Sequence, residues 1–189
     1  MFYEILEKAK TTEKIIGLSL YGEVGFFCGV VLEYSDDIIK LLQYTKYGKN
    51  DGVTLQPISE IERIDFDDNF TNALEFLTKN QKALNTTYYT NKFYTDLDDE
   101  NWQNQVLDLY VKEKKVMLSI QINNDDCYQG FIEAKNDITF SYRCIGDIGD
   151  DKGLAFFKID DVTNIKIDDL ECRKRLLLFQ NRNSKKVNI

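Results

Sequence analysis

Hydrophobic and polar residues alternate in several short runs along this chain, and each run predicts a strand with one buried face. The clearest are K-I-I-G-L-S-L in the first half and K-V-M-L-S-I-Q-I in the second. Turns rich in Asn, Asp and Gly separate the runs, and these residues suit tight antiparallel connections because they tolerate positive φ. Each half therefore predicts four strands, followed by an apolar ladder that forms a fifth. The expected strands are 14–21, 25–34, 37–46 and 52–58 with Ile58/Ile61/Ile64, and 115–122, 126–134, 137–145 and 153–159 with Ile159/Val162/Ile165.

Helical spacing of apolar residues flanks each set of strands. Phe2, Ile5, Leu6 and Ala9 recur at i, i+3, i+4 and i+7 before the first set. Trp102, Val106 and Leu109 do so before the second, with Asp98 or Asp99 as an N-cap. After the strands, the pairs Asp67-Asp68 and Asp168-Asp169 precede further helical stripes, where a carboxylate caps the helix and complements its dipole. Each unit is thus expected to run helix, strands, helix.

The two halves repeat one pattern at an offset of 101 residues. Gly29, Gly48 and Gly52 match Gly130, Gly149 and Gly153, and Asp67-Asp68 matches Asp168-Asp169. Upstream, the correspondence shifts by one, so that Ile16, Leu18 and Leu20 align with Val116, Leu118 and Ile120. We interpret the chain as an internal duplication.

Short strands with one alternating face favour small closed barrels over open sheets. The expected fold class is mainly β with flanking helices (α+β): two tandem small antiparallel five-stranded barrels of the SH3/Sm-like kind, each with N- and C-terminal helices. The expected division is copy one at 1–84, an aromatic-rich connector at 85–98 and copy two at 99–189.

The composition of the chain disfavours several classes of function. The chain has 189 residues, a net charge of −8 and no histidine, so the commonest catalytic base is missing. The acidic balance disfavours binding to phosphate backbones. Four cysteines stand far apart, without the close pairs of a zinc or redox site. With neither signal-peptide nor transmembrane patterning, we expect a cytoplasmic protein without membrane association, cofactor or metal.

The first copy resembles the Sm-like family of small barrels. The resemblance rests on Tyr21-Gly22-Glu23 in a turn, the strand Phe27 to Val31, the acidic turn Ser35-Asp36-Asp37, the strand Ile38 to Leu42 and P-I-S-E-I-E-R-I. It implies an SH3-like barrel and raises RNA binding as an expectation. The family's RNA-binding Asn is replaced by Ile39 or Lys40 and by Phe140 or Ser141, and its Arg-Gly step by Gln56-Pro57 and Phe157-Lys158.

Two groups of side chains are candidate contact sites. The aromatic residues Tyr88, Tyr89, Phe93, Tyr94 and Trp102 can grip a partner or stack on bases, or else pack within the protein. The basic run Arg173, Lys174 and Arg175 can contact nucleic acid or an acidic partner, or else form the solvated face of a helix. Seven Asp-Asp pairs are interpreted as turns and caps, and Cys28 and Cys127 as buried small hydrophobes.

Three functional hypotheses remain open. The first is a non-catalytic protein-interaction protein, with a homo-oligomer possible. The second is an RNA-binding Sm-like protein, supported by the resemblance and the basic run. The third is an acidic inhibitor or immunity protein that neutralises a basic toxin or nuclease, for which the net charge of −8 would accelerate binding. An enzyme is the least favoured class.

Overall fold

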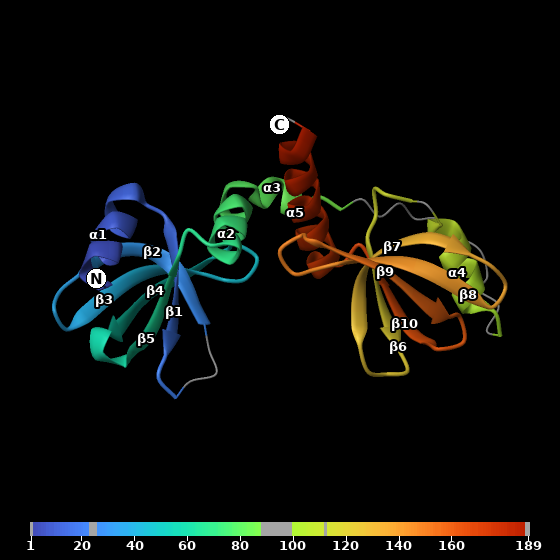
Figure 1. Cartoon of the computed structure of the whole chain (residues 1–189), viewed down its shortest axis with the longest axis horizontal. Coiled ribbons are helices and arrows are strands. Elements are labelled where there is room, and N and C mark those ends of the chain that lie inside the picture. Colours follow the sequence, from blue (N-terminus) through green and yellow to red (C-terminus); the bar gives the residue numbers. More distant parts are fainter. Residues whose placement is uncertain (1, 23–25, 88–99, 112, 188–189) are drawn as a thin grey trace. The chain divides into compact units, whose positions relative to one another are not determined.

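The computed structural model describes residues 2–22, 26–87, 100–111 and 113–187, with side chains up to Ser184. It divides into two compact units, residues 1–81 and 82–189. The described residues form two antiparallel five-stranded sheets and five α-helices (Figure 1). The expected class, mainly β with flanking helices, is confirmed.

Unit 1 begins with a helix, continues through five strands and ends with helices. Its elements are α1 (Phe2–Thr12), β1 (Ile15–Leu20), β2 (Phe26–Tyr34), β3 (Ile38–Tyr44), β4 (Asn50–Pro57), the 3-10 turn η1 (Ile58–Glu60), β5 (Ile61–Phe66) and α2 (Asn69–Lys79). The short helix α3 (Gln81–Leu84) crosses the boundary into unit 2.

Unit 2 has the same succession. Its elements are α4 (Trp102–Tyr110), β6 (Leu118–Ile122), β7 (Cys127–Lys135), β8 (Thr139–Ile145), β9 (Asp151–Lys158), β10 (Val162–Ile167) and α5 (Leu170–Val187). The strand order is β4-β3-β2-β1-β5 in unit 1 and, read in the same direction, β9-β8-β7-β6-β10 in unit 2. Corresponding strands therefore occupy corresponding places.

The prediction of closed barrels is wrong. In both sheets the hydrogen-bonded order has two ends, so β4 and β5 are edges in unit 1, and β9 and β10 are edges in unit 2. Between β4 and β5 the chain passes through η1, and the amide of Ile58 donates to the Asp37 carbonyl (2.8 Å). Alternation reports which face of a strand is buried, but not whether the terminal strands pair with each other.

The strand registers of the two units can be compared residue by residue. Gly29 lies opposite Gln43 and Gly130 opposite Cys144, which is the predicted offset of 101. The alignment of the first strands is wrong by two residues, because Leu18 pairs with Phe27 and Ile64, whereas Ile120 pairs with Tyr128 and Ile165. The equivalent of Leu18 is thus Ile120, not Leu118. A slip of two residues preserves a period-two pattern, so only the pairing partners distinguish the two alignments.

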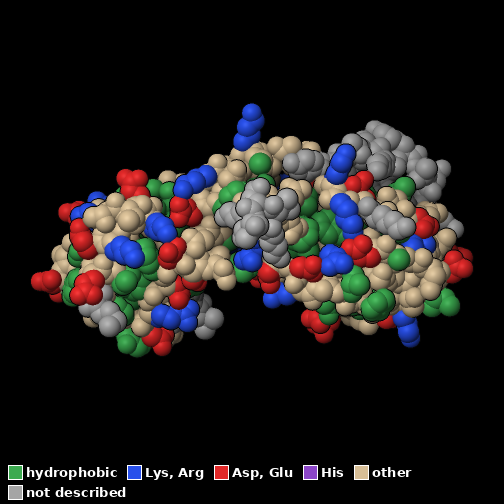
Figure 2. All heavy atoms as spheres, turned by 45° about the horizontal axis from the view of Figure 1, so that its top comes forward, with side chains coloured by type: hydrophobic (Ala, Val, Ile, Leu, Met, Phe, Trp, Pro, Cys, Tyr) green, Lys and Arg blue, Asp and Glu red, His purple; other side chains and the backbone are tan. Residues whose placement is uncertain are grey.

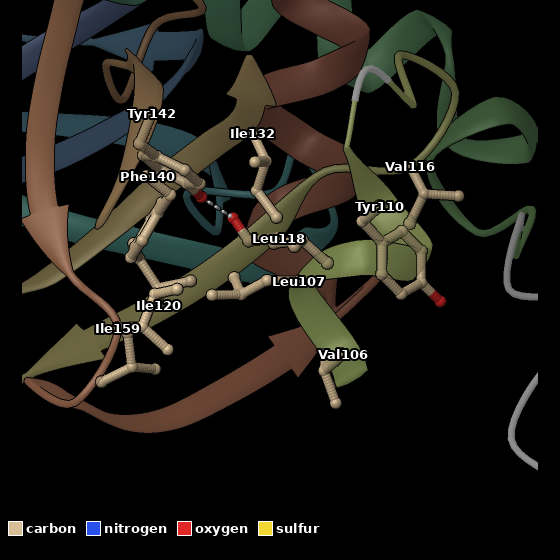
Figure 3. Close-up of a cluster of buried hydrophobic side chains, with 11 residues drawn as sticks. Val106, Leu107, Tyr110, Val116, Leu118, Ile120, Ile132, Phe140, Tyr142 and Ile159 are labelled. Carbon is tan, nitrogen blue, oxygen red and sulfur yellow. Dashed lines mark hydrogen bonds between the residues drawn. The ribbon is translucent and has the colours of Figure 1, made fainter. Parts of the chain in front are cut away.

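Each sheet is covered on both faces. In unit 1, α1 supplies Leu6 and Ala9 to a core on one face, and Leu74 of α2 packs with Ile15 and Cys28 on the other. In unit 2, Figure 3 shows the core formed by α4 and the sheet, where the buried hydroxyl of Tyr142 donates to the Leu118 carbonyl (2.6 Å). Burial raises the pKa of Tyr142 well above its usual value, which keeps this donor protonated.

The aspartate pairs cap the second helix of each unit, as predicted. The Asp68 carboxylate accepts from the Thr71 amide (2.7 Å) in a capping box, and the Asp169 carboxylate accepts from the Cys172 amide (2.7 Å). The preceding residues, Asp67 and Asp168, adopt positive φ (60° and 54°). These caps fix where α2 and α5 begin, and therefore which helical residues lie on the sheet.

Candidate functional site

The predicted aromatic contact site lies mostly outside the described residues. Tyr88, Tyr89, Phe93 and Tyr94 all belong to the segment 88–99. Trp102 is described: it begins α4 and packs, half-buried, against the core of unit 2. Whether the aromatic group binds a partner stays a prediction.

The side chains of the predicted basic site, Arg173, Lys174 and Arg175, make their contacts within unit 2. Arg173 donates to the carbonyls of Leu84 (3.1 Å) and Asp168 (2.8 Å). Lys174 is 5% exposed, and its Nζ lies 2.7 Å from Glu171 Oε1. Arg175 donates to the same carboxylate oxygen (3.0 Å), to the Ile145 carbonyl (2.7 Å) and to Asp147. Of these cations, Arg175 ties α5 to the end of β8 through Ile145. A partner contact by the run stays a prediction.

The cysteines differ in their surroundings. All four are unpaired; Cys28 and Cys172 are buried, whereas Cys127 is exposed. The interpretation of Cys127 as a buried hydrophobe is therefore wrong, because it lies at the first position of β7, beside the turn from β6. Burial raises the pKa of Cys28 to about 12 and raises that of Cys172 further.

We expect Cys127 to react first with a disulfide reagent such as DTNB, because it is exposed, whereas burial shields Cys28 and Cys172 and raises the pKa of both thiols. Mass mapping after a short exposure should find the label on Cys127, with Cys28 and Cys172 modified only in guanidinium chloride. Equal labelling of Cys28 and Cys127 in the folded protein would contradict the burial described above.

Two kinds of site are absent from the described part of the chain. Within it, no three Cys, Asp or Glu side chains are grouped so that they could hold a metal ion. None of its helices combines the length and apolar character needed to cross a membrane.

The edge strands β4 and β9 carry exposed apolar side chains. Val53 and Leu55 on β4 are 53% and 63% exposed, and Leu154 and Phe156 on β9 are 50% and 75% exposed. The register places Leu42 opposite Val53 and Arg143 opposite Leu154, so these are equivalent positions in the two units. We call these four residues the apolar edges. Figure 2 shows hydrophobic side chains on the surface interspersed with acidic and basic ones.

The opposite edges are protected differently. On β5 the exposed positions are Glu62 and Arg63, and on β10 they are Thr163, Asn164 and Lys166. Charged and polar side chains on an edge strand discourage pairing with another chain. On β4 and β9 the central exposed positions are apolar, and Asp51 and Pro57, or Lys152 and Lys158, stand only at their two ends. The apolar edges are therefore the better candidates for a contact surface.

An apolar row crosses unit 1 and ends at its apolar edge. Ile15 lies opposite Val30, Val30 opposite Leu42, and Leu42 opposite Val53. Directly opposed residues share a face of the sheet, so the row continues across four strands. Beside α2 it forms the floor of a groove of about 550 Å³, which we call the α2 groove. Its walls include Tyr44 of β3 and Glu75 and Thr78 of α2.

The equivalent place in unit 2 is filled. Phe131 and Phe179 stand where unit 1 has Val30 and Thr78, and their ring centroids are 5.9 Å apart. The equivalence on the helix follows from Gly48, which approaches Thr78, and Gly149, which approaches Phe179. Arg143 replaces Leu42 and forms ion pairs with Glu133 (2.7 Å) and Asp151 (2.8 Å). Hydrogen bonds from Lys114 and Arg143 lower the pKa of Glu133, which keeps it ionised.

Inspection of the sequence did not identify the apolar edges or the α2 groove. The segments V-T-L-Q and L-A-F-F both alternate, and such alternation is equally typical of a strand that packs on a core. The available signal was the similarity of the two halves, because both halves place two large apolar residues just after Gly52 or Gly153. That these segments form edges is decided by the pairing of strands.

Comparisons with known proteins identify no relative. No protein-family model, curated protein sequence or solved structure matches this chain. The resemblance to Sm-like barrels therefore stays an expectation.

Proposed function

We propose that this chain is a non-catalytic protein-interaction protein whose contact surfaces are the apolar edges on β4 and β9. One observation carries the proposal: two large apolar side chains are exposed on the same edge strand in both units, namely Val53 and Leu55, and Leu154 and Phe156. An edge strand also offers unpaired backbone donors and acceptors to an added strand. A partner that pairs with β4 or β9 would satisfy these groups and bury the apolar side chains.

The proposal includes an internal duplication of a small, open Sm-like unit. The shared strand order and the offset of 101 through β2, β3 and β4 support a common origin of the two halves. Small β units of this kind serve widely as binding modules, which is support by analogy of fold. We assign the protein to the cytoplasm because its four cysteines are unpaired.

The two alternatives differ in the partner they require. Binding of RNA through the basic run would compete with the internal contacts of Arg173, Lys174 and Arg175. An inhibitor of a basic toxin or nuclease is favoured by the net charge of −8, which would accelerate association with a cationic partner. It would be a special case of protein interaction.

The test is affinity capture of the tagged protein from its own cell extract, with and without RNase. We expect a protein that survives RNase treatment and is lost when Leu55→Lys and Phe156→Lys are combined. Lysine on an exposed edge strand remains solvated there and opposes strand addition, so the variant should fold. Tyr21→Lys is the matched control, because Tyr21 is 59% exposed and belongs to the turn after β1 and not to β4 or β9.

Other outcomes contradict the proposal. RNA that is recovered with the wild-type protein and removed by RNase would favour the Sm-like alternative. A partner that binds the edge variant as well as it binds the wild-type protein would place the contact surface elsewhere.

A further inference from the structure

We infer that the α2 groove of unit 1 is a receptor for one aromatic side chain, phenylalanine or tyrosine, of the partner protein. This inference rests on the proposed function and specifies what the partner must present. It concerns unit 1 alone, because unit 2 fills the equivalent place with its own side chains.

The groove has the size and chemistry of a site for a neutral ring. Its volume of about 550 Å³ is large enough to admit one aromatic ring. The floor is apolar, with Ile15, Val30 and Leu42 in one row and the Tyr44 ring beside them. Its charged rim balances to zero: two lysines, Lys10 and Lys79, and two glutamates, Glu13 and Glu75. Lys79 and Glu75 also neutralise each other, with 2.5 Å between nitrogen and oxygen.

Unit 2 shows what this part of the fold accommodates. At the positions of Val30 and Thr78 it carries Phe131, which is 2% exposed, and Phe179. The two rings pack at 5.9 Å between centroids, and Lys114 Nζ lies 5.2 Å from the Phe131 ring centroid. Aromatic rings thus fit between this helix and this sheet when the chain supplies them. Val30 and Thr78 are both smaller and leave the corresponding space in unit 1 open.

Continuity with the apolar edge points to a protein as the source of the ring. Leu42 lines the groove and lies directly opposite Val53, which is on the exposed edge strand β4. A side chain on a strand added to β4 would be too short to reach the groove, because that strand would lie about 10 Å from β3. A partner chain that pairs with β4 and then crosses over Val53 would bring one of its aromatic side chains to the groove floor. In unit 2 the row is interrupted by Arg143, whose ion pairs with Glu133 and Asp151 separate Phe131 from Leu154.

The test uses p-cresol, the tyrosine side chain as a free molecule, with the full chain labelled at its methyl groups. We expect saturable NMR shifts at the methyl groups of Ile15, Val30, Leu32 and Leu42, with a Kd of about 1 mM, the strength expected for so small a ligand. Thr78→Phe copies Phe179 into unit 1 and should weaken binding at least tenfold. Thr163→Phe makes the same change at an exposed position on β10 and should leave the Kd unchanged.

A second variant keeps the test valid if Thr78→Phe fails to fold. If Thr78→Phe loses the native methyl spectrum, Leu42→Arg takes its place, because it copies Arg143 and interrupts the apolar row. No saturable shift at the groove, or shifts that both substitutions leave unchanged, would overturn the inference. Either result would leave the proposed function standing, since capture of a partner through the apolar edges is measured separately with the Lys variants of Leu55 and Phe156.

Discussion

Replacing Gly130 with alanine is expected to destabilise unit 2 by about 3 kcal/mol, the upper part of the range for overpacked cores. An added Cβ would lie 1.8 Å from the Arg143 carbonyl oxygen and 2.9 Å from its carbon, so the neighbouring backbone of β8 would have to move. Gly29 is the equivalent in unit 1, at 2.5 Å from the Leu42 carbonyl oxygen. Both glycines allow the paired strands to approach closely. In unit 1 this approach positions the apolar row, and in unit 2 it positions the corresponding residues Phe131, Arg143 and Leu154.

Urea denaturation followed by the fluorescence of Trp102 measures this effect. Trp102 is the single tryptophan of the chain and packs against the core of unit 2. Gly153→Ala is the matched control: Gly153 has a φ of +87° but open space around its Cβ position, so the cost is only about 1 kcal/mol of backbone strain. Equal losses in the two variants would show that the contact between β7 and β8 is looser than described.

Replacing Glu171 with alanine is expected to cost about 3 kcal/mol, because removing one partner leaves buried cations with fewer acceptors. One oxygen of Glu171 accepts from both Lys174 (2.7 Å) and Arg175 (3.0 Å). The Lys174 side chain is 6% exposed and that of Arg175 is 15% exposed, so water replaces the carboxylate poorly. The same urea titration, read at Trp102, measures the loss.

Glu75→Ala provides the comparison for an exposed pair. Glu75 forms an ion pair with Lys79, one helical turn away, but the Lys79 side chain is 68% exposed. Loss of this ion pair should therefore lower the free energy of unfolding by no more than about 0.5 kcal/mol. Because Glu75 lies in unit 1, its effect is read by circular dichroism. If Glu171→Ala also cost less than 1 kcal/mol, the basic run would not be a structural element of unit 2, and its assignment as a partner contact would gain support.

Local patterns predicted most of the secondary structure. Period-two runs placed the strands, and the Asp pairs before α2 and α5 marked where those helices begin, because both signals act over a few residues. Closure of the sheet and the alignment of β1 with β6 were mispredicted for a common reason. Both depend on which strands exchange hydrogen bonds, and a shift of two residues leaves the apolar pattern unchanged.

The candidate site was predicted less well than the fold. Arg173, Lys174 and Arg175 suggested a solvated or partner-binding face. Glu171 lies within four residues of Lys174 and Arg175, but the two arginines also bond to Leu84, Ile145 and Asp147, which are far away along the chain. The sequence also did not predict that Leu55 and Phe156 are exposed, because a strand shows the same alternation of apolar and polar residues at the edge of a sheet as in its centre. Pairing between distant segments determines both features, and one sequence carries little direct signal of it.

The central claim is that a protein partner binds the apolar edges, and the most direct test is the affinity of the recovered partner for purified variants. Isothermal titration calorimetry should compare wild-type protein, the Leu55→Lys/Phe156→Lys double variant and Tyr21→Lys. We predict at least a tenfold rise in Kd for the double variant, equivalent to about 1.4 kcal/mol, and an unchanged Kd for Tyr21→Lys. An unchanged Kd for the folded double variant would contradict the account.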